Sequence, residues 1–530
     1  METYLQYQRI RRAVRQTLSN IEEKCTCEGY TVGFVHKPSC QLGSFDSTRE
    51  KQPSGPTIDA SCDVIAVGWD GPDDPLKPAN MSVQRKLALT LLVSLIAVAV
   101  TATSAIDACG LREYSKDFQI SEVVGSLATG LFLVGFAFGS LLSGPFSETF
   151  GRNAVYSTTM LVFLIFIMAA GLAPNLQSHL IFRFLAGLFA STPLSCAGGT
   201  VADLWNPVEK AYAFPVYAIP AFSGPMLGQM IGSYIPTTIG WRWLEWMMLI
   251  LGGAVLVAVL LLQPETYGSL ILYWKAKILR EMTGDERYRA PMEIEHEGLA
   301  HRLRTSIYRP FAMFYSELII ILVSLYLTIL YIVLFTFLEG YSFIFGETYG
   351  ISEGLTSLCW AGMLVGSLLV SCIVPLIYSW TVKEYAKTSV IRPETRLWYA
   401  MLGGAPAVPV SLFWMGWTSN PSISIWSPLV ASVLFGYGIT TIFIISYMYL
   451  IDAYDTYSAS ALGFLVFTRY VVAGGVTVAG SPIYRAIGVH YTLTILGAIS
   501  GVMTVVPYLL YVFGPRIRRK SKYAVNVDPQ

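Results

Sequence analysis

Long apolar stretches alternate with short polar links along most of the chain. Each stretch is close to the roughly 20 residues that an α-helix needs to cross a bilayer. The first six cover residues 86–107, 122–142, 154–172, 178–202, 211–233 and 241–262, and the second six cover 314–338, 354–378, 396–417, 425–450, 457–481 and 491–514. The pattern predicts an all-α membrane protein with twelve transmembrane helices, arranged as two six-helix halves around a central cavity.

Polar segments flank and separate these halves. The predicted units are a tail at 1–85, the first half at 86–262, a central loop at 263–313, the second half at 314–514 and a tail at 515–530. Lysine and arginine concentrate in the tails and the central loop, whereas the alternate links carry few. Because basic residues favour the cytosolic side of a membrane, both termini are predicted to be cytosolic.

The N-terminal tail allows two interpretations. Residues 5–21 place apolar side chains among several arginines, which fits a short helix on a membrane surface or a solvated tail. Cys25, Cys27, His36 and Cys40 follow. Their spacing fits no common zinc pattern, so we expect free thiols and no metal site.

Composition supports a membrane protein and excludes several functions. The chain of 530 residues is 54% hydrophobic and 13% charged, whereas soluble domains carry roughly 25% charged residues. The net charge is +1, and no basic patch interleaved with aromatic residues suggests a nucleic-acid partner. The sequence has no G-x-x-x-x-G-K-[ST] loop for nucleotide phosphates. We therefore expect no enzyme and no cofactor, and any transport would be driven by a gradient.

The link between the second and third spans carries the motif Gly144-x-x-x-Glu148-x-x-Gly151-Arg152. Its glycines allow backbones to approach closely. The motif resembles the major facilitator superfamily, whose corresponding loop reads G-x-x-x-D-x-x-G-R. We predict that Glu148 and Arg152 form a latch that breaks and re-forms as the two halves rock. The alternative is a charged turn that only sets topology.

The fifth span contains Gly224, Pro225, Gly228 and Gly232. The proline favours a kink, and the glycines form one small face that can pack tightly against a neighbour. The stretch resembles the G-P-x-x-G-G motif of proton-coupled drug exporters, with Gln229 in place of the second glycine. The resemblance implies export and a helix contact that prevents proton leak; the alternative is a kinked packing helix.

Charged residues inside spans are costly and usually functional. Asp107 ends the first span and Arg183 lies at a similar depth in the fourth. We predict that they pair and couple transport to the proton. The alternatives are an Asp107 that only begins the outer loop and an Arg183 that reaches the headgroups. Arg469 lies near the midplane of the eleventh span, where we expect a carboxylate, backbone carbonyls, an anionic substrate group or a purely structural bridge.

Several aromatic and polar residues are candidates for lining a cavity for flat organic molecules. They are Tyr217, Gln229, Trp360, Tyr447 and Arg469. A single aromatic residue in a membrane helix is more often a packing residue, so packing is the alternative for each ring.

Further motifs extend the resemblance over nearly the whole chain. They are Trp69-Asp-Gly-Pro-x-Asp-Pro75, Gly198-Gly-Thr-Val-Ala-Asp-Leu-Trp205, Gly240-Trp-Arg-Trp243, Pro264-Glu-Thr-Tyr267 and Asp452-Ala-Tyr-x-x-Tyr-Ser-Ala-Ser-Ala461. Together they look like the fungal drug:proton antiporter family with twelve spans, in the branch that contains polyamine, multidrug and toxin-cluster exporters. Departures exist, including Met81 where tryptophan is usual.

The resemblance implies a major facilitator fold and a proton-coupled efflux transporter of a drug, toxin or secondary metabolite. It also implies a monomer in the fungal plasma membrane, with a small molecule, the proton and the lipid bilayer as partners. One alternative is a polyamine or vitamin carrier of the same family. An alternative of another class is a non-transporting membrane receptor with a transporter fold.

Overall fold

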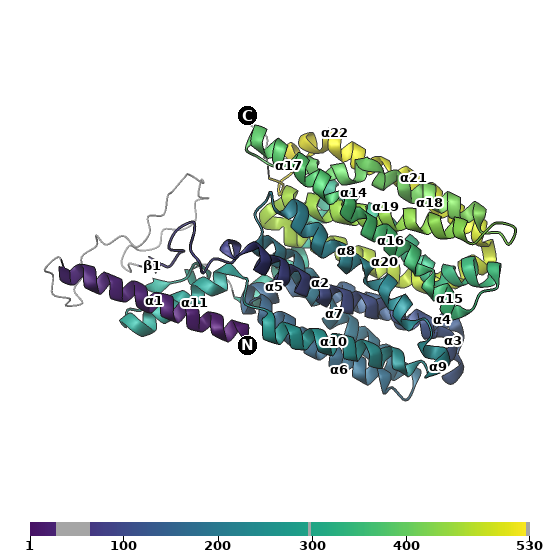
Figure 1. Cartoon of the computed structure of the whole chain (residues 1–530), viewed down its shortest axis with the longest axis horizontal. Coiled ribbons are helices and arrows are strands. Elements are labelled where there is room, and N and C mark those ends of the chain that lie inside the picture. The colour runs from purple at the N-terminus through teal and green to yellow at the C-terminus, as the bar shows by residue number, and fades with distance from the viewer. Residues whose placement is uncertain (28–63, 295–297, 526–530) are drawn as a thin grey trace.

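The computed structural model describes residues 1–27, 64–294 and 298–525. Long helices form two groups that lie side by side, with the helix axes roughly aligned (Figure 1). The first group consists of α2 (Val83–Ile106), α5 (Leu127–Phe150), α6 (Arg152–Gly171), α7 (Leu176–Leu204), α8 (Lys210–Gly232) and α10 (Arg242–Leu262). These helices correspond to the six apolar stretches predicted for the first half.

The second group follows the central segment of the chain. It consists of α14 (Leu318–Tyr341), α15 (Glu353–Leu358), α16 (Trp360–Leu369), α17 (Val374–Thr388), α18 (Ala405–Thr418), α19 (Trp426–Tyr454), α20 (Ser458–Ile487), α21 (Val489–Met503) and α22 (Val505–Lys520). Helices α15–α17 follow one another within one apolar segment, Glu353–Thr388, and α21 and α22 within another, Val489–Lys520. Short breaks therefore divide several of the predicted spans without ending them.

Eleven helical segments of the described chain are long and apolar enough to cross a membrane. The fifth predicted span, α8, is not among them, because three prolines together with tyrosine and glycine lower its hydropathy. It nevertheless lies within the bundle, where it packs along α2 in its own group and along α16 in the other. The apolar pattern thus identifies this helix by its position among the others.

The two groups share one continuous apolar core. Contact between them runs mainly along two helix pairs, α5 with α20 and α8 with α16. Short helices close one end of the bundle: α3 (Leu111–Asp117), α4 (Glu122–Gly125), α9 (Ile235–Thr238) and α15. We call this the α9 end and the opposite one the α1 end (Figure 1).

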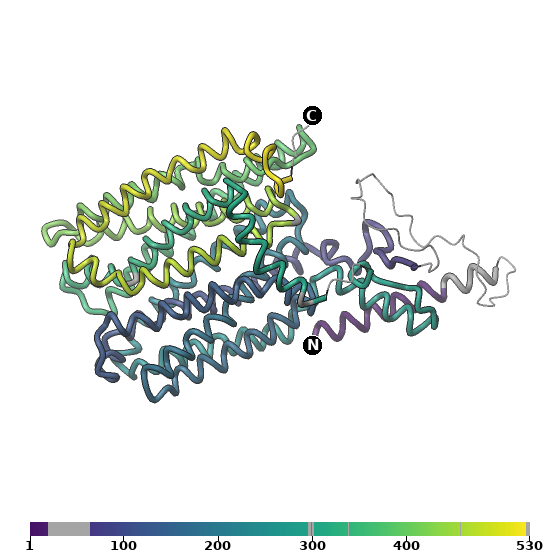
Figure 2. Tube along the Cα trace, turned by 180° about the vertical axis from the view of Figure 1, so that it is seen from behind, coloured from purple at the N-terminus to yellow at the C-terminus, as the bar shows by residue number. Residues whose placement is uncertain are grey.

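Polar segments form a small layer outside the α1 end. It contains α1 (Glu2–Cys27), α11 (Gly268–Thr283), α12 (Pro291–Ile294) and α13 (Leu299–Ser316), with strand β1 (Ile65–Ala66) parallel to β2 (Tyr288–Arg289). Figure 2 shows from behind that the purple first helix and the teal central segment project beyond the bundle.

The apolar face of α1 is covered by protein. Ile10 and Val14 are buried against Ile271 and Ile278 of α11. The apolar face of this helix therefore packs on α11, which neither interpretation of the tail predicts. The region from Cys25 through His36 to Cys40 lies outside the described residues or has no described side chains.

Candidate functional site

Four ionisable side chains meet inside the first helix group, near the α9 end. Asp107 begins the turn after α2, His179 and Arg183 lie one turn apart on α7, and Glu245 lies on α10. The Arg183 Nε lies 2.7 Å from Asp107 Oδ2, and its Nη1 lies 3.5 Å from Glu245 Oε1. His179 Nε2 is 3.8 Å from the same Asp107 oxygen. We call these four residues the ionic cluster.

The ionic cluster is sealed from solvent. No side chain in it is more than 4% exposed. Arg183 also donates to the carbonyl of Thr103 and lies 4.7 Å from the ring of Phe132. Two carboxylates thus share one guanidinium, in a place where water cannot screen charge.

The sequence predicts the contact between Asp107 and Arg183, and the two side chains do lie together. It does not predict Glu245 or His179. Glu245 lies four residues inside the sixth predicted span, which is a usable signal, because an acid there needs a buried partner. Their role in coupling to protons stays a prediction.

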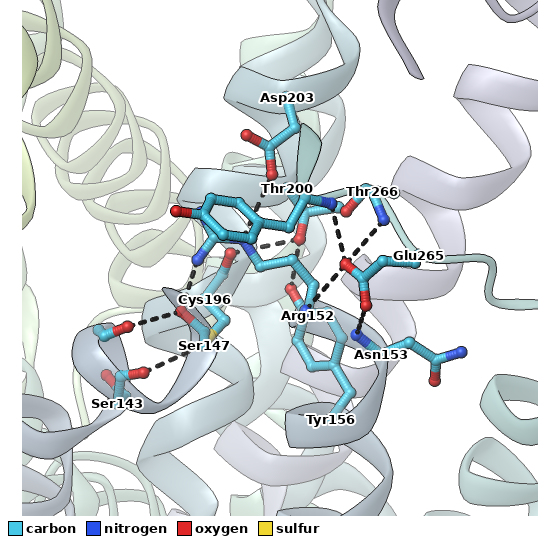
Figure 3. A network of polar contacts seen from close by, with 12 residues as sticks. Ser143, Ser147, Arg152, Asn153, Tyr156, Cys196, Thr200, Asp203, Glu265 and Thr266 are labelled. Atoms are coloured by element: carbon cyan, nitrogen blue, oxygen red, sulfur yellow. Dashed lines mark hydrogen bonds and ion pairs between the residues drawn. The ribbon is translucent and has the colours of Figure 1, made fainter. Parts of the chain in front are cut away.

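A second network surrounds Arg152, the first residue of α6 (Figure 3). Its Nε donates to Asp203 Oδ2 on α7 at 3.3 Å, and its Nη1 donates to Ser147 Oγ on α5 at 2.5 Å. The guanidinium lies 5.3 Å from the ring of Tyr267. Arg152 therefore links three helices and the segment after α10.

The predicted partner of Arg152, Glu148, is not its partner in the described structure. Glu148 is on α5, whereas Gly151 ends that helix with φ of 90° and Arg152 starts the next one. The four-residue spacing rule applies only within one helix, so the turn separates the two charges. Gly144 also differs from expectation, because an added Cβ there would meet open space rather than a packed backbone.

Glu265 holds the start of α6 in place. Its carboxylate accepts from the backbone N–H groups of Arg152 and Asn153, and also from those of Thr266 and Tyr267. Burial raises the pKa of Glu265, and these hydrogen bonds oppose the rise by favouring the ionised form. A carboxylate at a helix N-terminus is also favoured by the helix dipole.

The glycine face of α8 packs against α2. A Cβ at Gly228 would lie 2.4 Å from the carbonyl of Ala102, and one at Gly224 or Gly232 would also meet α2 or the turn after it closely. Gln229 beside them donates to the carbonyl of Ala105 at 2.6 Å. The predicted tight contact is therefore present around Pro225. It joins α2, which leads into Asp107 of the ionic cluster, to α8, whose side chains line both cavities described below.

Two cavities lie between the helix groups, one towards each end. The cavity at the α1 end has a volume of about 300 Å³ and is lined by Gly144, Glu148, Arg152, Tyr217 and Tyr447, among others. Both helix groups contribute to its wall, and the residues of the predicted latch lie at the same wall as two of the predicted aromatic candidates.

The cavity at the α9 end has a volume of about 240 Å³. Gln229, Trp360 and Glu339 are among its lining residues. Trp360 stacks on Tyr341 with ring centroids 4.4 Å apart. Glu339 on α14 was missed by sequence reasoning, although a carboxylate close to the end of a span is again the signal that could have found it.

Ion pairs join the two helix groups beside this cavity. Arg112 contacts Glu353, and Arg485 lies 2.9 Å from Glu122. At the α1 end the groups are joined by neutral acceptors instead: Arg396 donates to the carbonyl of Pro207 at 3.0 Å. Contacts across the groups thus exist at both ends.

Arg469 on α20 is fully buried among aromatic rings. Its guanidinium lies 4.5 Å from the ring of Tyr331, 4.9 Å from Tyr470, 5.2 Å from Tyr447 and 5.3 Å from Phe443. Its Nη2 donates to the Tyr447 hydroxyl at 2.7 Å, whereas Nε and Nη1 have no hydrogen-bond partner. We call these rings the aromatic cage.

The surroundings of Arg469 differ from those that the sequence predicts. Within the described residues no carboxylate forms an ion pair with Arg469 and no backbone carbonyl accepts from it, so neither the predicted structural bridge nor the carbonyl contact is present. Cation–π contact replaces the ion pair. Sequence reasoning could place the charge near the midplane, but it could not tell which side chains of other helices surround it.

Comparisons with known proteins agree with this architecture. Residues 87–478 match the family described as Major Facilitator Superfamily. The chain is 49% identical over 467 residues to the MFS-type transporter kojT of Aspergillus flavus, covering 87% of this chain and 82% of the relative. It is 34% identical over 483 residues to the ascochitine biosynthesis cluster MFS transporter of Didymella fabae, covering 90% and 93%.

A solved structure shows the same fold at low identity. The proton:xylose symporter XylE, bound to 6-bromo-6-deoxy-D-glucose, superposes with a TM-score of 0.60 at 15% identity and covers 82% of this chain and 97% of its own. The family match spans most of the chain, and the relatives align over nearly their whole length. The chain therefore belongs to the Major Facilitator Superfamily, whose members are multi-pass membrane transporters and not enzymes.

Proposed function

We propose that the chain is a proton-coupled antiporter that exports a small organic molecule, such as a drug, toxin or secondary metabolite, across the plasma membrane. The ionic cluster is the observation that carries the proposal. A buried site with two carboxylates and one guanidinium can bind and release a proton with a change of partners, as coupling requires. The relative from the ascochitine biosynthesis cluster supports a secondary metabolite as cargo.

The geometry of the ionic cluster supports proton coupling as part of this proposal. When Asp107 is ionised, it holds Arg183 at 2.7 Å. A proton on Asp107 removes that attraction, and Glu245, 3.5 Å from the same guanidinium, becomes its counter-ion. Because Asp107 ends α2 and Glu245 lies on α10, the exchange changes the force between these helices. His179 beside Asp107 is a second acceptor for the proton.

The α1 end is the cytosolic end in this proposal. The basic central segment and C-terminal tail lie there, in line with the preference of lysine and arginine for the cytosol. Arg152, with Glu148 and Gly144 in the same wall and Gly151 before it in the chain, acts at the cytosolic gate through Asp203. The protein works as a monomer, and no cofactor takes part.

Two alternatives are weighed against this proposal. A polyamine carrier would need carboxylates facing its polycationic cargo, and the cavity walls carry carboxylates together with basic groups: Glu148 with Arg152 at the α1 end, and Glu339 with Arg485 at the α9 end. A non-transporting receptor has no need of a buried group that changes partner with a proton. Both remain outcomes of the test below.

The test measures export against external pH. Culture medium of cells that express the chain is compared by mass spectrometry with medium of cells that lack it, at several pH values, to find molecules whose release depends on the chain. Asp107→Asn should abolish the pH dependence of that release while the protein stays at the membrane. An unchanged pH profile in Asp107→Asn, or no dependent release at any pH, would contradict the proposal.

A further inference from the structure

Arg469 carries a buried positive charge that has no carboxylate counter-ion among the described residues. Its side chain is fully buried, and its Nη2 donates to the Tyr447 hydroxyl. Nε and Nη1 keep their N–H groups without a partner. An isolated charge in a low-dielectric interior is strongly unfavourable, and four ring faces compensate it only in part.

The cavity at the α1 end reaches this charge through one side chain. Tyr447 lines the cavity and accepts from Arg469, and Val466, which also lines the cavity, precedes Arg469 by one turn of α20. Arg469 itself is not part of the cavity wall and lies behind the Tyr447 hydroxyl. A ligand that enters from the α1 end would therefore meet the hydroxyl first and the charge behind it.

We propose that Arg469 and Tyr447 form the binding site for a small planar acid with a carboxylate on a conjugated ring, and this assignment rests on the proposed export function. When the ring of Tyr447 turns aside, Nη2 of Arg469 is released and binds the two carboxylate oxygens together with the neighbouring Nε, in the forked geometry that guanidinium and carboxylate share. The rings of Phe214 and Tyr217, which line the cavity with Tyr447, hold the flat body by stacking.

The chemistry of the cage also selects against other cargo. A cationic ligand would be repelled by an arginine that has no carboxylate beside it. A neutral aromatic ligand could stack on the rings but would leave the arginine charge uncompensated. The cavity volume of about 300 Å³ lies at the lower bound of typical ligand sites, which favours a compact molecule.

The test measures thermal unfolding of the purified full-length protein in detergent with three probes of one shape. They are 2-naphthoate, its neutral amide 2-naphthamide, and the cation 2-naphthylmethylammonium. We expect 2-naphthoate to raise the unfolding temperature and the other two to have little effect. Because binding is read without a membrane gradient, the result does not depend on transport. Equal stabilisation by the neutral or cationic probe would overturn the proposal, as would no stabilisation by 2-naphthoate up to about 1 mM, a weak limit for a specific site.

Variants locate the binding of 2-naphthoate. Arg469→Gln should abolish the preference for the acid, whereas Arg516→Gln, an arginine outside both cavities, should keep it. Should Arg469→Gln fail to fold, Tyr447→Phe decides, with an expected loss of about tenfold in affinity for one charge-assisted hydrogen bond. A preference that survives in Arg469→Gln, or an unchanged affinity in Tyr447→Phe, would overturn the assignment.

The same measurement separates this inference from the proposed function. Asp107→Asn should bind 2-naphthoate as the wild type does, because Asp107 lies in the ionic cluster and not in the cage. Retained binding together with lost pH dependence of export would support both proposals. Retained binding with an unchanged pH profile would contradict proton coupling through Asp107 and leave the cage assignment supported.

Discussion

Two fully buried arginines, one in each helix group, have opposite surroundings. Arg183 in the first helix group is held by Asp107 and faces Glu245, whereas Arg469 in the second group faces aromatic rings and one hydroxyl. Both charges are equally removed from water. The first is compensated by the protein's own carboxylates, so it can respond to a proton; the second is left uncompensated, so it can respond to an anion.

The difference shows that the surroundings of a buried charge indicate its role. Breaking a buried ion pair leaves an unpaired charge and costs about 3–5 kcal/mol. A buried charge that has no counter-ion already carries an uncompensated desolvation cost, and an apolar side chain of similar size removes that cost. The environment of an intramembrane arginine therefore indicates whether its charge serves the fold or a ligand. The predictions below test this distinction.

The largest effect is expected when the same substitution is made at both arginines. Arg183→Met leaves Asp107 and Glu245 buried with no guanidinium. It should lower the free energy of unfolding by about 3–5 kcal/mol and remove most of the protein from the membrane. Arg469→Met removes a charge without a counter-ion and should leave stability near the wild type. Thermal unfolding and membrane abundance measure both. Equal losses in the two variants would contradict the comparison.

A rescue should follow when the carboxylates are neutralised as well. Asp107→Asn and Glu245→Gln added to Arg183→Met remove the unpaired negative charges, so we expect at least half of the lost stability to return. Transport should then no longer depend on external pH. If the triple variant is no more stable than Arg183→Met, the cost at Arg183 comes from packing and not from charge.

One substitution can give Arg469 a carboxylate partner, as Arg183 has in the ionic cluster. Tyr447→Glu places a carboxylate where the hydroxyl now accepts from Arg469, and the new ion pair should abolish the stabilisation by 2-naphthoate. Tyr447→Gln, of nearly the same size and neutral, should weaken binding by about tenfold without abolishing the preference for the acid. Retained binding in Tyr447→Glu would show that the acid binds elsewhere.

A smaller effect is expected from the contact that positions α2. Gly228→Ala brings a Cβ within 2.4 Å of the Ala102 carbonyl, so α2 and α8 must separate. We expect a cost of about 1–3 kcal/mol and weaker pH dependence of export. Gly475→Ala in α20 is the matched control, because nothing lies within 4 Å of its added Cβ. Similar losses in both variants would mean that helix propensity or expression, and not this contact, is responsible.

The smallest effect is expected when one ring of the cage is removed. Phe443→Leu keeps an apolar side chain but loses one cation–π contact, worth about 0.5–1 kcal/mol. The affinity for 2-naphthoate should fall by less than about tenfold. The acid should still bind more tightly than the amide, because Arg469 is intact. A reversal of that order in Phe443→Leu would indicate that stacking, and not charge, determines the selectivity.

The sequence predicts the fold well because crossing a bilayer requires long apolar helices, and these are visible without knowledge of their neighbours. Contacts between helices are predicted only where a similar depth in the membrane is enough to identify the two partners, as for Asp107 and Arg183. Glu148 was expected to contact Arg152 because four residues separate them in the predicted turn, but Glu148 lies on α5 and Arg152 begins α6 after Gly151. Asp203 is the true partner, 51 residues away, and only the packing of α6 on α7 brings it near.

The arrangement of α1 has a consequence for biosynthesis. Gln6 exchanges hydrogen bonds with the backbone of Glu265, 259 residues later in the chain. At roughly 5–20 residues per second, the ribosome needs on the order of tens of seconds to reach that partner. Until then the apolar side chains of Ile10 and Val14 have no α11 to cover them. Helix α1 can thus dock on α11 only after the entire first helix group has been synthesised.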